Sequence, residues 1–178
     1  DGNVVANEKM QSSLKNVYVP GDVNGKNLLA HAAFKMGYIA ASEIVEGKSD
    51  KYNNNIIPRA IYTYPEIGSV GLTEEEAKKS YDVKVGKFNY GANGRALAHG
   101  DSSGMVKIIS DARYGEILGA HIVGPRASEL INEVSILMQS EVIVEEAIKM
   151  VFGHPTFSEA IYEAIADVEG VSVHLPKK

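Results

Sequence analysis

The stretch GMVKIISDARYGEILGAHIVGPRASELINEVSILMQ, residues 104–139, decides the fold. It contains two β-type runs, residues 104–110 and 116–123, joined by a short polar segment, which predicts an antiparallel hairpin. Pro125 then opens a segment whose apolar residues follow helical spacing, which predicts a helix directly after the hairpin.

The elements around this stretch repeat its pattern of strands followed by helices. Upstream, three runs are typical of strands, at residues 58–64, 69–72 and 83–90. Thr73 and Glu76 have the spacing of a capping box and predict a short helix between the second and third of these runs. Downstream, one helix is predicted over residues 144–152 and another after Pro155. We therefore expect an α+β domain, an antiparallel sheet with helices on one side.

The N-terminal part of the chain has a different texture. Residues 16–20 predict a short buried strand, and residues 26–46 predict a long helix. The polar segment that follows is interpreted as a linker, so we expect two parts, residues 1–50 and 51–178. A strand needs neighbours, and the first part supplies few. We therefore interpret it as the last strand and helix of another domain.

Composition excludes several classes of protein. The chain has 178 residues, 44% of them hydrophobic and 23% charged, which is ordinary for a globular protein. The net charge of −5, without a basic block, favours neither a nucleic acid nor an anionic membrane as partner. The absence of cysteine excludes disulfides, thiolate metal sites and a cysteine nucleophile in this chain, and it fits a cytoplasmic protein. Because the chain starts at Asp1 without a signal-like segment, we expect a fragment or a processed chain.

The hexapeptide His154-Pro155-Thr156-Phe157-Ser158-Glu159 is the strongest candidate for chemistry. A turn here would fold Glu159 back onto the imidazole of His154, fixing the tautomer and leaving the other ring nitrogen as a proton acceptor. The alternative is a capping box between Thr156 and Glu159, which spacing alone favours. The two interpretations can coexist.

Two weaker candidates lie near the N-terminus. Asp22, after the predicted strand, would suit the hydroxyl groups of a ligand, although an ordinary Gly-Asp turn is favoured. The start of the long helix would offer backbone N–H groups to a partly anionic ligand, although a helix start without a chemical role is favoured. The residues at this helix start are Leu28, Leu29, Ala30 and His31.

The remaining motifs predict no chemistry of their own. Asn93-Gly94-Arg95 is interpreted as a tight turn carrying a surface arginine, and His121 as a structural residue within a strand. His99 and His174 have no partner at an informative spacing. The histidines are too scattered to predict a metal site.

Several motifs together resemble a known family. They are residues 16–22 (NVYVPGD), 28–31 (LLAH), 58–66 (PRAIYTYPE), 69–73 (SVGLT), 92–96 (ANGRA), 117–125 (ILGAHIVGP) and 154–159 (HPTFSE). In this order they resemble the C-terminal part of dihydrolipoamide dehydrogenases, within the pyridine nucleotide–disulfide oxidoreductases. The resemblance covers nearly the whole chain.

The resemblance implies roles for the candidate residues. In such an enzyme an FAD domain and an NAD domain precede a C-terminal interface domain that forms the homodimer. Asp22 matches the aspartate that binds the FAD ribityl chain, and residues 28–31 match backbone that faces the flavin. His154 and Glu159 match the acid–base pair that reaches into the partner's disulfide site, a Cys-x4-Cys motif that this chain lacks.

The expected function is therefore the C-terminal part of an enzyme that oxidises dihydrolipoamide with NAD. Its partners would be a second copy and the lipoyl groups of 2-oxo acid dehydrogenase or glycine cleavage complexes. We expect the chain alone to be inactive and to retain neither FAD nor NAD. The alternatives are a non-catalytic dimerisation module, or the same part of a related disulfide reductase such as glutathione reductase.

Overall fold

The computed structural model describes residues 2–176 and divides the chain into two compact units, Asp1–Ile57 and Pro58–Lys178. Each unit has its own hydrophobic core. The motif around His154 belongs to the larger unit, whereas Asp22 and residues 28–31 belong to the smaller one.

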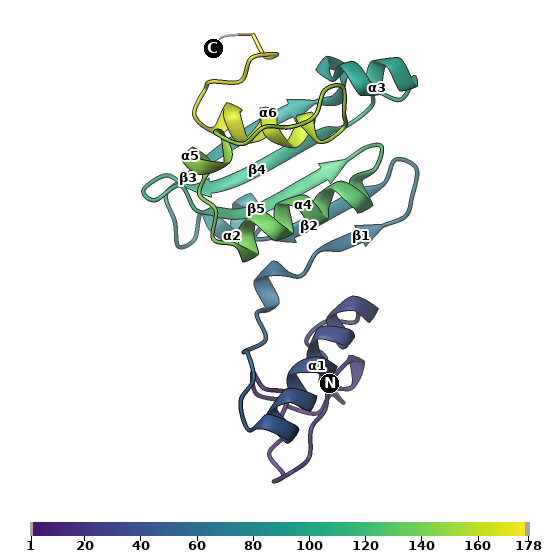
Figure 1. Cartoon of the computed structure of the whole chain (residues 1–178), viewed down its shortest axis with the longest axis vertical. Helices are drawn as coiled ribbons and strands as arrows, with labels where there is room; N and C mark the ends of the chain where they lie inside the picture. Colours follow the sequence, from purple (N-terminus) through teal and green to yellow (C-terminus); the bar gives the residue numbers. More distant parts are fainter. Residues whose placement is uncertain (1, 177–178) are drawn as a thin grey trace. The chain divides into compact units, whose positions relative to one another are not determined.

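The larger unit is built on one five-stranded sheet in the order β1-β2-β5-β4-β3, with every neighbouring pair antiparallel (Figure 1). The predicted hairpin is present, with a register shift between Ile109 and Ser110. Edge strand β1 is shorter than the run predicted there, because it pairs with β2 over only three residues. The strands are β1 Arg59–Ile61, β2 Ile67–Gly71, β3 Val83–Asn89, β4 Met105–Asp111 and β5 Ile117–Val123.

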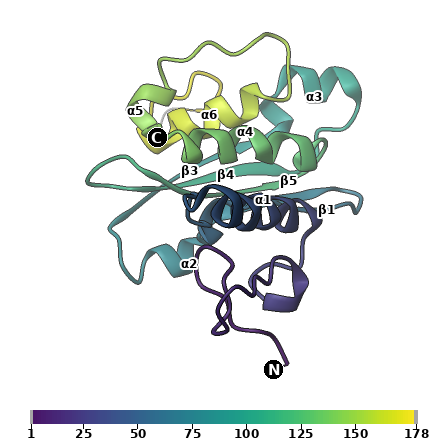
Figure 2. The same cartoon turned by 60° about the horizontal axis from the view of Figure 1, so that its bottom comes forward.

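Two helices cover one face of this sheet (Figure 2). Helix α4, Ala127–Gln139, packs on β1, β2 and β5, and helix α6, Glu159–Val168, packs on β3 and β4. The predicted α+β architecture is therefore confirmed. The core between helices and sheet is aliphatic, and its fully buried members include Val70, Val106, Ile108, Ile122, Val134, Ile161 and Ile165.

Helix α6 lies against β3 without a side chain between them at Gly86. A Cβ atom at this position would collide with the backbone oxygen of Ala164 and the backbone nitrogen of Val168. Gly68 of β2 receives α4 in the same way, through the backbone oxygen of Ala127. Both helices are thus seated on the sheet by close approach of backbone to backbone.

Three short helices complete the larger unit: α2 Glu74–Ala77, α3 Gly94–His99 and α5 Val144–Ala147. The predicted capping box of α2 is present, because Thr73 and Glu76 bond to each other's backbone N–H groups. Helix α5 ends well before the predicted Phe152. The tight turn predicted at Asn93 is wrong: the Asn93 side chain accepts the N–H of Ala96 and starts α3.

The smaller unit holds one long helix, α1, Ala30–Glu46. It ends before Gly47, as predicted, and Gly47 adopts the left-handed conformation; the helix begins at Ala30, four residues after the predicted start at residue 26. The strand predicted at residues 16–20 is wrong, since only an isolated bridge between Gln11 and Tyr18 forms. Within the described part of this unit no further strand lies alongside to complete a ladder. Its core consists of Met10, Ala32, Met36, Ile39, Ala40 and Tyr52.

Three single 3-10 turns connect these elements: η1 Asp22–Asn24, η2 Asn54–Ile56 and η3 Tyr90–Ala92. Across residues 2–176, no helix has both the length and the apolar character needed to cross a bilayer.

Candidate active site

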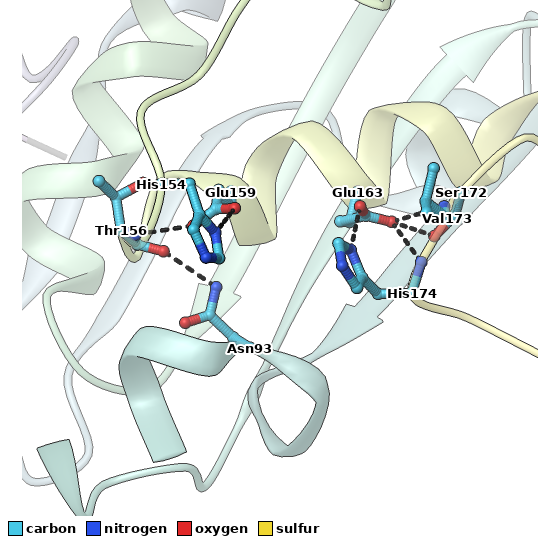
Figure 3. A network of polar contacts seen from close by, with 8 residues as sticks. All are labelled: Asn93, His154, Thr156, Glu159, Glu163, Ser172, Val173 and His174. Carbon is cyan, nitrogen blue, oxygen red and sulfur yellow. Dashed lines mark hydrogen bonds and ion pairs between the residues drawn. The ribbon is translucent and has the colours of Figure 1, made fainter. Parts of the chain in front are cut away.

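The predicted contact between His154 and Glu159 is present at the start of α6 (Figure 3). The Nδ1 atom of His154 lies 2.8 Å from Oε1 of Glu159, while Oε2 of Glu159 accepts the backbone N–H of Thr156 at 2.7 Å. Because a carboxylate only accepts hydrogen bonds, this arrangement places a proton on Nδ1. In the neutral ring Nε2 is then the proton acceptor.

The competing capping box is half formed. Glu159 accepts the N–H of Thr156, as the glutamate of such a box does, but the Thr156 hydroxyl turns back and donates to the carbonyl of Gly153 at 2.7 Å. The helix begins after Ser158, whose side chain makes no capping bond. Glu159 therefore braces the helix start and contacts the imidazole at the same time. The peptide bond between His154 and Pro155 is cis, which the sequence did not predict.

The loop that carries His154 is held from several sides. The Asn93 side chain donates to the carbonyl of Thr156 at 3.0 Å (Figure 3). The ring of Phe157 packs edge-on against Tyr90 and His99, at centroid distances of 6.2 and 5.8 Å. The hydroxyl of Ser158 donates to Glu133 of α4 at 2.7 Å. These contacts bind the loop to α3, α4 and the end of the sheet.

The imidazole itself faces outward. The side chain of His154 is 73% exposed, whereas that of Glu159 is 19% exposed. Met150 and Val151, just before the motif, are also exposed, Val151 almost completely. Exposed apolar side chains in the same segment as an accessible ring are typical of a surface that a partner or substrate covers.

A second pair of the same kind lies further along α6 and was missed in the sequence. Nδ1 of His174 lies 2.7 Å from Oε1 of Glu163 (Figure 3). The Oε2 atom of Glu163 accepts hydrogen bonds from the Ser172 hydroxyl and from the backbone N–H groups of Val173 and His174. No partner was predicted for His174, because the sequence offers none at an informative spacing; in the structure Glu163 is that partner. Eleven residues, a helix end and a turn separate the two side chains, so no local spacing indicates the pair.

The pKa of Glu163 follows from these contacts. Burial raises the pKa of this carboxyl, but the hydrogen bonds from Ser172 and His174 lower it by more, so the net pKa lies below the usual value. Glu163 is thus held as a carboxylate inside the protein.

The candidate cofactor residues lie together in the smaller unit. Gly21 packs against Ala33 of α1, which brings the turn carrying Asp22 beside the start of that helix. Asp22 is exposed, and so is Leu28. Leu29 stands at the N-cap of α1 without a side-chain capping bond, and Ala30 and His31 form the first turn. An exposed carboxylate can accept hydrogen bonds from the hydroxyl groups of a ligand.

Helix α1 is apolar on two sides. Its inner side carries the buried residues of the unit's core, whereas Phe34, Tyr38 and Val45 project outward and are exposed. These three positions follow the spacing of one helix face. A helix that is apolar on both sides is typical of the interior of a larger domain.

The other histidines do not assemble into a site. His121 lies within β5, as predicted; burial and then the nearby Lys107 lower its pKa. His99 contacts the Phe157 ring. From residue 2 to residue 176, no three His, Cys, Asp or Glu side chains are grouped so that they could hold a metal ion.

Comparison with known proteins gives concordant matches. The model of the pyridine nucleotide-disulphide oxidoreductase dimerisation domain matches residues 57–165. Dihydrolipoyl dehydrogenase from Bacillus subtilis is 41% identical over 96% of this chain, and that from Halobacterium salinarum is 39% identical over 98%. The chain spans 37% of the length of each of these two relatives.

Solved structures show the same fold. LpdA from Mycobacterium tuberculosis superposes with a TM-score of 0.88 at 24% identity, over 93% of this chain and 36% of that protein. The Cu(II) complex of the flavoprotein disulfide reductase RclA from Escherichia coli gives 0.83 at 26% identity, over 93% of this chain and 38% of that protein. Because the dimerisation-domain model covers more than half of the sequence, the chain belongs to the pyridine nucleotide-disulphide oxidoreductase family.

Proposed function

We propose that this chain is the C-terminal part of an NAD-dependent dihydrolipoamide dehydrogenase, in which His154 and Glu159 form the acid–base pair. The observation that carries the proposal is the 2.8 Å contact between the two side chains, with the imidazole exposed. The names of the relatives, at about 40% identity, support the choice of substrate. The lipoyl groups of 2-oxo acid dehydrogenase or glycine cleavage complexes would be its partners.

The proposed role of His154 follows from thiol chemistry. A thiol attacks a disulfide as its thiolate, so dihydrolipoamide must first lose a proton. The Nε2 atom of His154 would take that proton, and Glu159, bonded to Nδ1, would stabilise the imidazolium that forms. The thiolate would then form a bond to one sulfur of the enzyme's disulfide and release the other sulfur as a thiolate. That disulfide lies outside this chain, which has no cysteine.

The smaller unit would contribute to the flavin site. Asp22 would hold hydroxyl groups of the FAD ribityl chain, and residues 28–31 would lie against its ring. When bound, FAD would supply an electron acceptor for the reduced disulfide. The doubly apolar helix α1 supports the idea that this unit belongs to a larger domain. No residue of this chain is assigned to NAD.

Homodimer formation is the second part of the proposal. Residues 57–165 match a dimerisation domain, and the exposed Val151 lies three residues before His154. A partner covering this loop would bring the imidazole to a disulfide on the other subunit. We expect light scattering at micromolar concentration to give the mass of a dimer, and a clean monomer would argue strongly against it.

The assignment of His154 is tested in the full-length enzyme with His154→Gln, and with His174→Gln as the matched control. We expect His154→Gln to lower the rate of dihydrolipoamide oxidation by about 10²–10⁴-fold, the usual contribution of a general base. The control variant should retain most of the activity. Unchanged turnover in His154→Gln would refute the assignment.

A separate assay tests the expected inactivity of the 178-residue chain. We expect it not to oxidise dihydrolipoamide, because it lacks the redox cysteines, and not to bind FAD, because it has no G-x-G-x-x-G motif to hold the pyrophosphate. Measurable turnover, or a flavin spectrum in the purified chain, would contradict the expected inactivity.

The cytoplasmic location of the protein stays a prediction from the composition.

A further inference from the structure

The side chain of Asn93 is the starting point, because it is buried and uses both ends of its amide. The residue is 3% exposed. Its Oδ1 atom accepts the backbone N–H of Ala96 at 2.9 Å, and its Nδ2 atom donates to the carbonyl of Thr156 at 3.0 Å. The amide thus joins the first turn of α3 to a loop 63 residues further along the chain.

Thr156 is the residue through which this contact reaches the proposed acid–base pair. Its carbonyl accepts from Asn93, and its backbone N–H donates to Oε2 of Glu159 at 2.7 Å. The other oxygen of Glu159 contacts Nδ1 of His154. Three hydrogen bonds therefore run in series from a buried amide to an exposed imidazole (Figure 3).

The two ends of this series differ in their freedom to move. Asn93 is enclosed, and a buried amide that loses a partner is costly, so its position is well determined. The His154 ring is 73% exposed and has little packing of its own. The carboxylate of Glu159 can hold the ring in one orientation only if the Thr156 backbone beside it is fixed.

We propose that Asn93 is a positioning residue for the His154–Glu159 pair. By fixing the backbone of Thr156 it orients the Glu159 carboxylate and so keeps the proton of the neutral imidazole on Nδ1. The inference deepens the proposed function and rests on it for its consequence in catalysis. The hydrogen-bond series itself is a property of the chain and is testable without turnover.

The test uses the second pair on α6 as an internal reference. Two-dimensional ¹H–¹⁵N correlation of the imidazole rings in the 178-residue chain reports the tautomer of each neutral histidine. The wild-type chain should have both His154 and His174 mainly as the Nδ1–H form. Asn93 makes none of the hydrogen bonds of the Glu163 carboxylate, so its substitution should leave the His174 signal unchanged.

The informative variant is Asn93→Asp. An aspartate keeps an acceptor for the N–H of Ala96, and therefore the cap of α3, but it cannot donate to the Thr156 carbonyl. We expect the ratio of Nδ1–H to Nε2–H forms of His154 to fall severalfold, with His174 as in the wild type. Asn93→Ala should give the same change together with a less stable α3.

The matched control is Asn132→Asp on α4, whose amide donates to the carbonyls of Ser128 and Glu129 on an exposed surface. It should leave both histidines unchanged. An unaltered His154 tautomer in folded Asn93→Asp would overturn the proposal, and so would an equal change at both histidines. An unfolded Asn93→Asp chain would show Asn93 to be a determinant of the fold instead.

The outcome for the wild-type chain separates this inference from the proposed function. If His154 of the unmodified chain is mainly the Nε2–H form, then Nδ1 does not donate a hydrogen bond to Glu159 in solution, and both proposals are wrong. If only the Asn93 variants contradict expectation, the acid–base assignment stands.

In the full-length enzyme, Asn93→Asp should lower kcat about tenfold with little change in KM, a typical cost of misplacing a catalytic group.

Discussion

The two histidine–glutamate pairs whose glutamates lie on α6 make the same contact between the same atoms but hold different segments of the chain. In both, Nδ1 of an imidazole contacts Oε1 of a glutamate, at 2.8 Å for His154 and 2.7 Å for His174. The glutamates are four residues apart, on one face of the helix. The first pair holds a loop before the helix, and the second holds the segment after it.

Burial of the carboxylate separates the two pairs. The side chain of Glu159 is 19% exposed and accepts one backbone N–H besides the imidazole. That of Glu163 is 4% exposed and accepts two backbone N–H groups, a hydroxyl and the imidazole. A carboxylate shared among many donors serves mainly to hold backbone, whereas one with few partners is available to a ring. The comparison teaches that the residue types alone do not distinguish a structural anchor from the proposed acid–base pair.

The largest effect is expected for Glu163→Ala. Removing this carboxylate leaves four donors without their acceptor, so we expect the free energy of unfolding to fall by about 3 kcal/mol. Urea denaturation measures the loss, with Glu159→Ala as the control, for which we expect about 1 kcal/mol. Equal losses in the two variants would remove the distinction between anchor and acid–base site.

The same carboxylate should make stability depend on pH. The pKa of Glu163 is lower in the folded chain than its ordinary value of 4.5. Its contribution is therefore complete above that value and is lost as the pH falls below it, toward the folded pKa. We expect the wild-type chain to lose stability as the pH falls below 4.5, and Glu163→Gln to lose less over the same range.

Other carboxyl groups share this behaviour, so the slope in Glu163→Gln should become shallower rather than vanish. Hydrogen bonds from Lys107 and Lys78 lower the pKa of Glu74 to about 2, and the side chain and backbone of Ser128 lower that of Glu66. Urea titrations at several pH values give the slopes. Identical slopes in wild type and variant would contradict the assignment of a lowered pKa to Glu163.

A smaller effect is expected for His174→Gln. The variant loses one of the donors to Glu163 but keeps the backbone N–H groups and the hydroxyl, so we expect a loss of about 1 kcal/mol. Hydrogen exchange should become faster at the amides of Val173 and His174, which are bonded to Glu163 in the structure. Unchanged exchange at these amides would show that the ring does not support the segment.

The smallest effect on stability is expected for His154→Gln. An exposed side chain with one charged partner contributes little, so the free energy of unfolding should change by no more than about 0.5 kcal/mol. Thermal unfolding followed by circular dichroism measures this. A loss comparable to that of Glu163→Ala would make His154 a structural residue and weaken its assignment as the base.

The first pair was predictable from sequence because it is local. Five residues separate His154 from Glu159, and Pro155 marks the start of a new helix. The second pair joins residues across a helix end, and the contact of Asn93 with Thr156 spans two elements, so neither leaves a short-range pattern.

The same distinction between local and long-range features decides which parts of the fold could be predicted from the sequence. The hairpin of β4 and β5 and the capping box at Thr73 are local features, and both are present. The strand predicted at residues 16–20 failed because its apolar pattern says nothing about a neighbour to pair with. Helix α3 was missed because its start depends on Asn93, a residue equally typical of turns.

The direct backbone contact between α6 and Gly86 limits which substitutions this position can accept during evolution. Since α6 rests there directly on the main chain of β3, no side chain is available as an adjustable spacer beneath the helix. Any residue larger than glycine at this position would collide with the backbone of Ala164 and Val168, and so would have to displace the helix that carries the glutamates of both the structural anchor and the proposed acid–base pair.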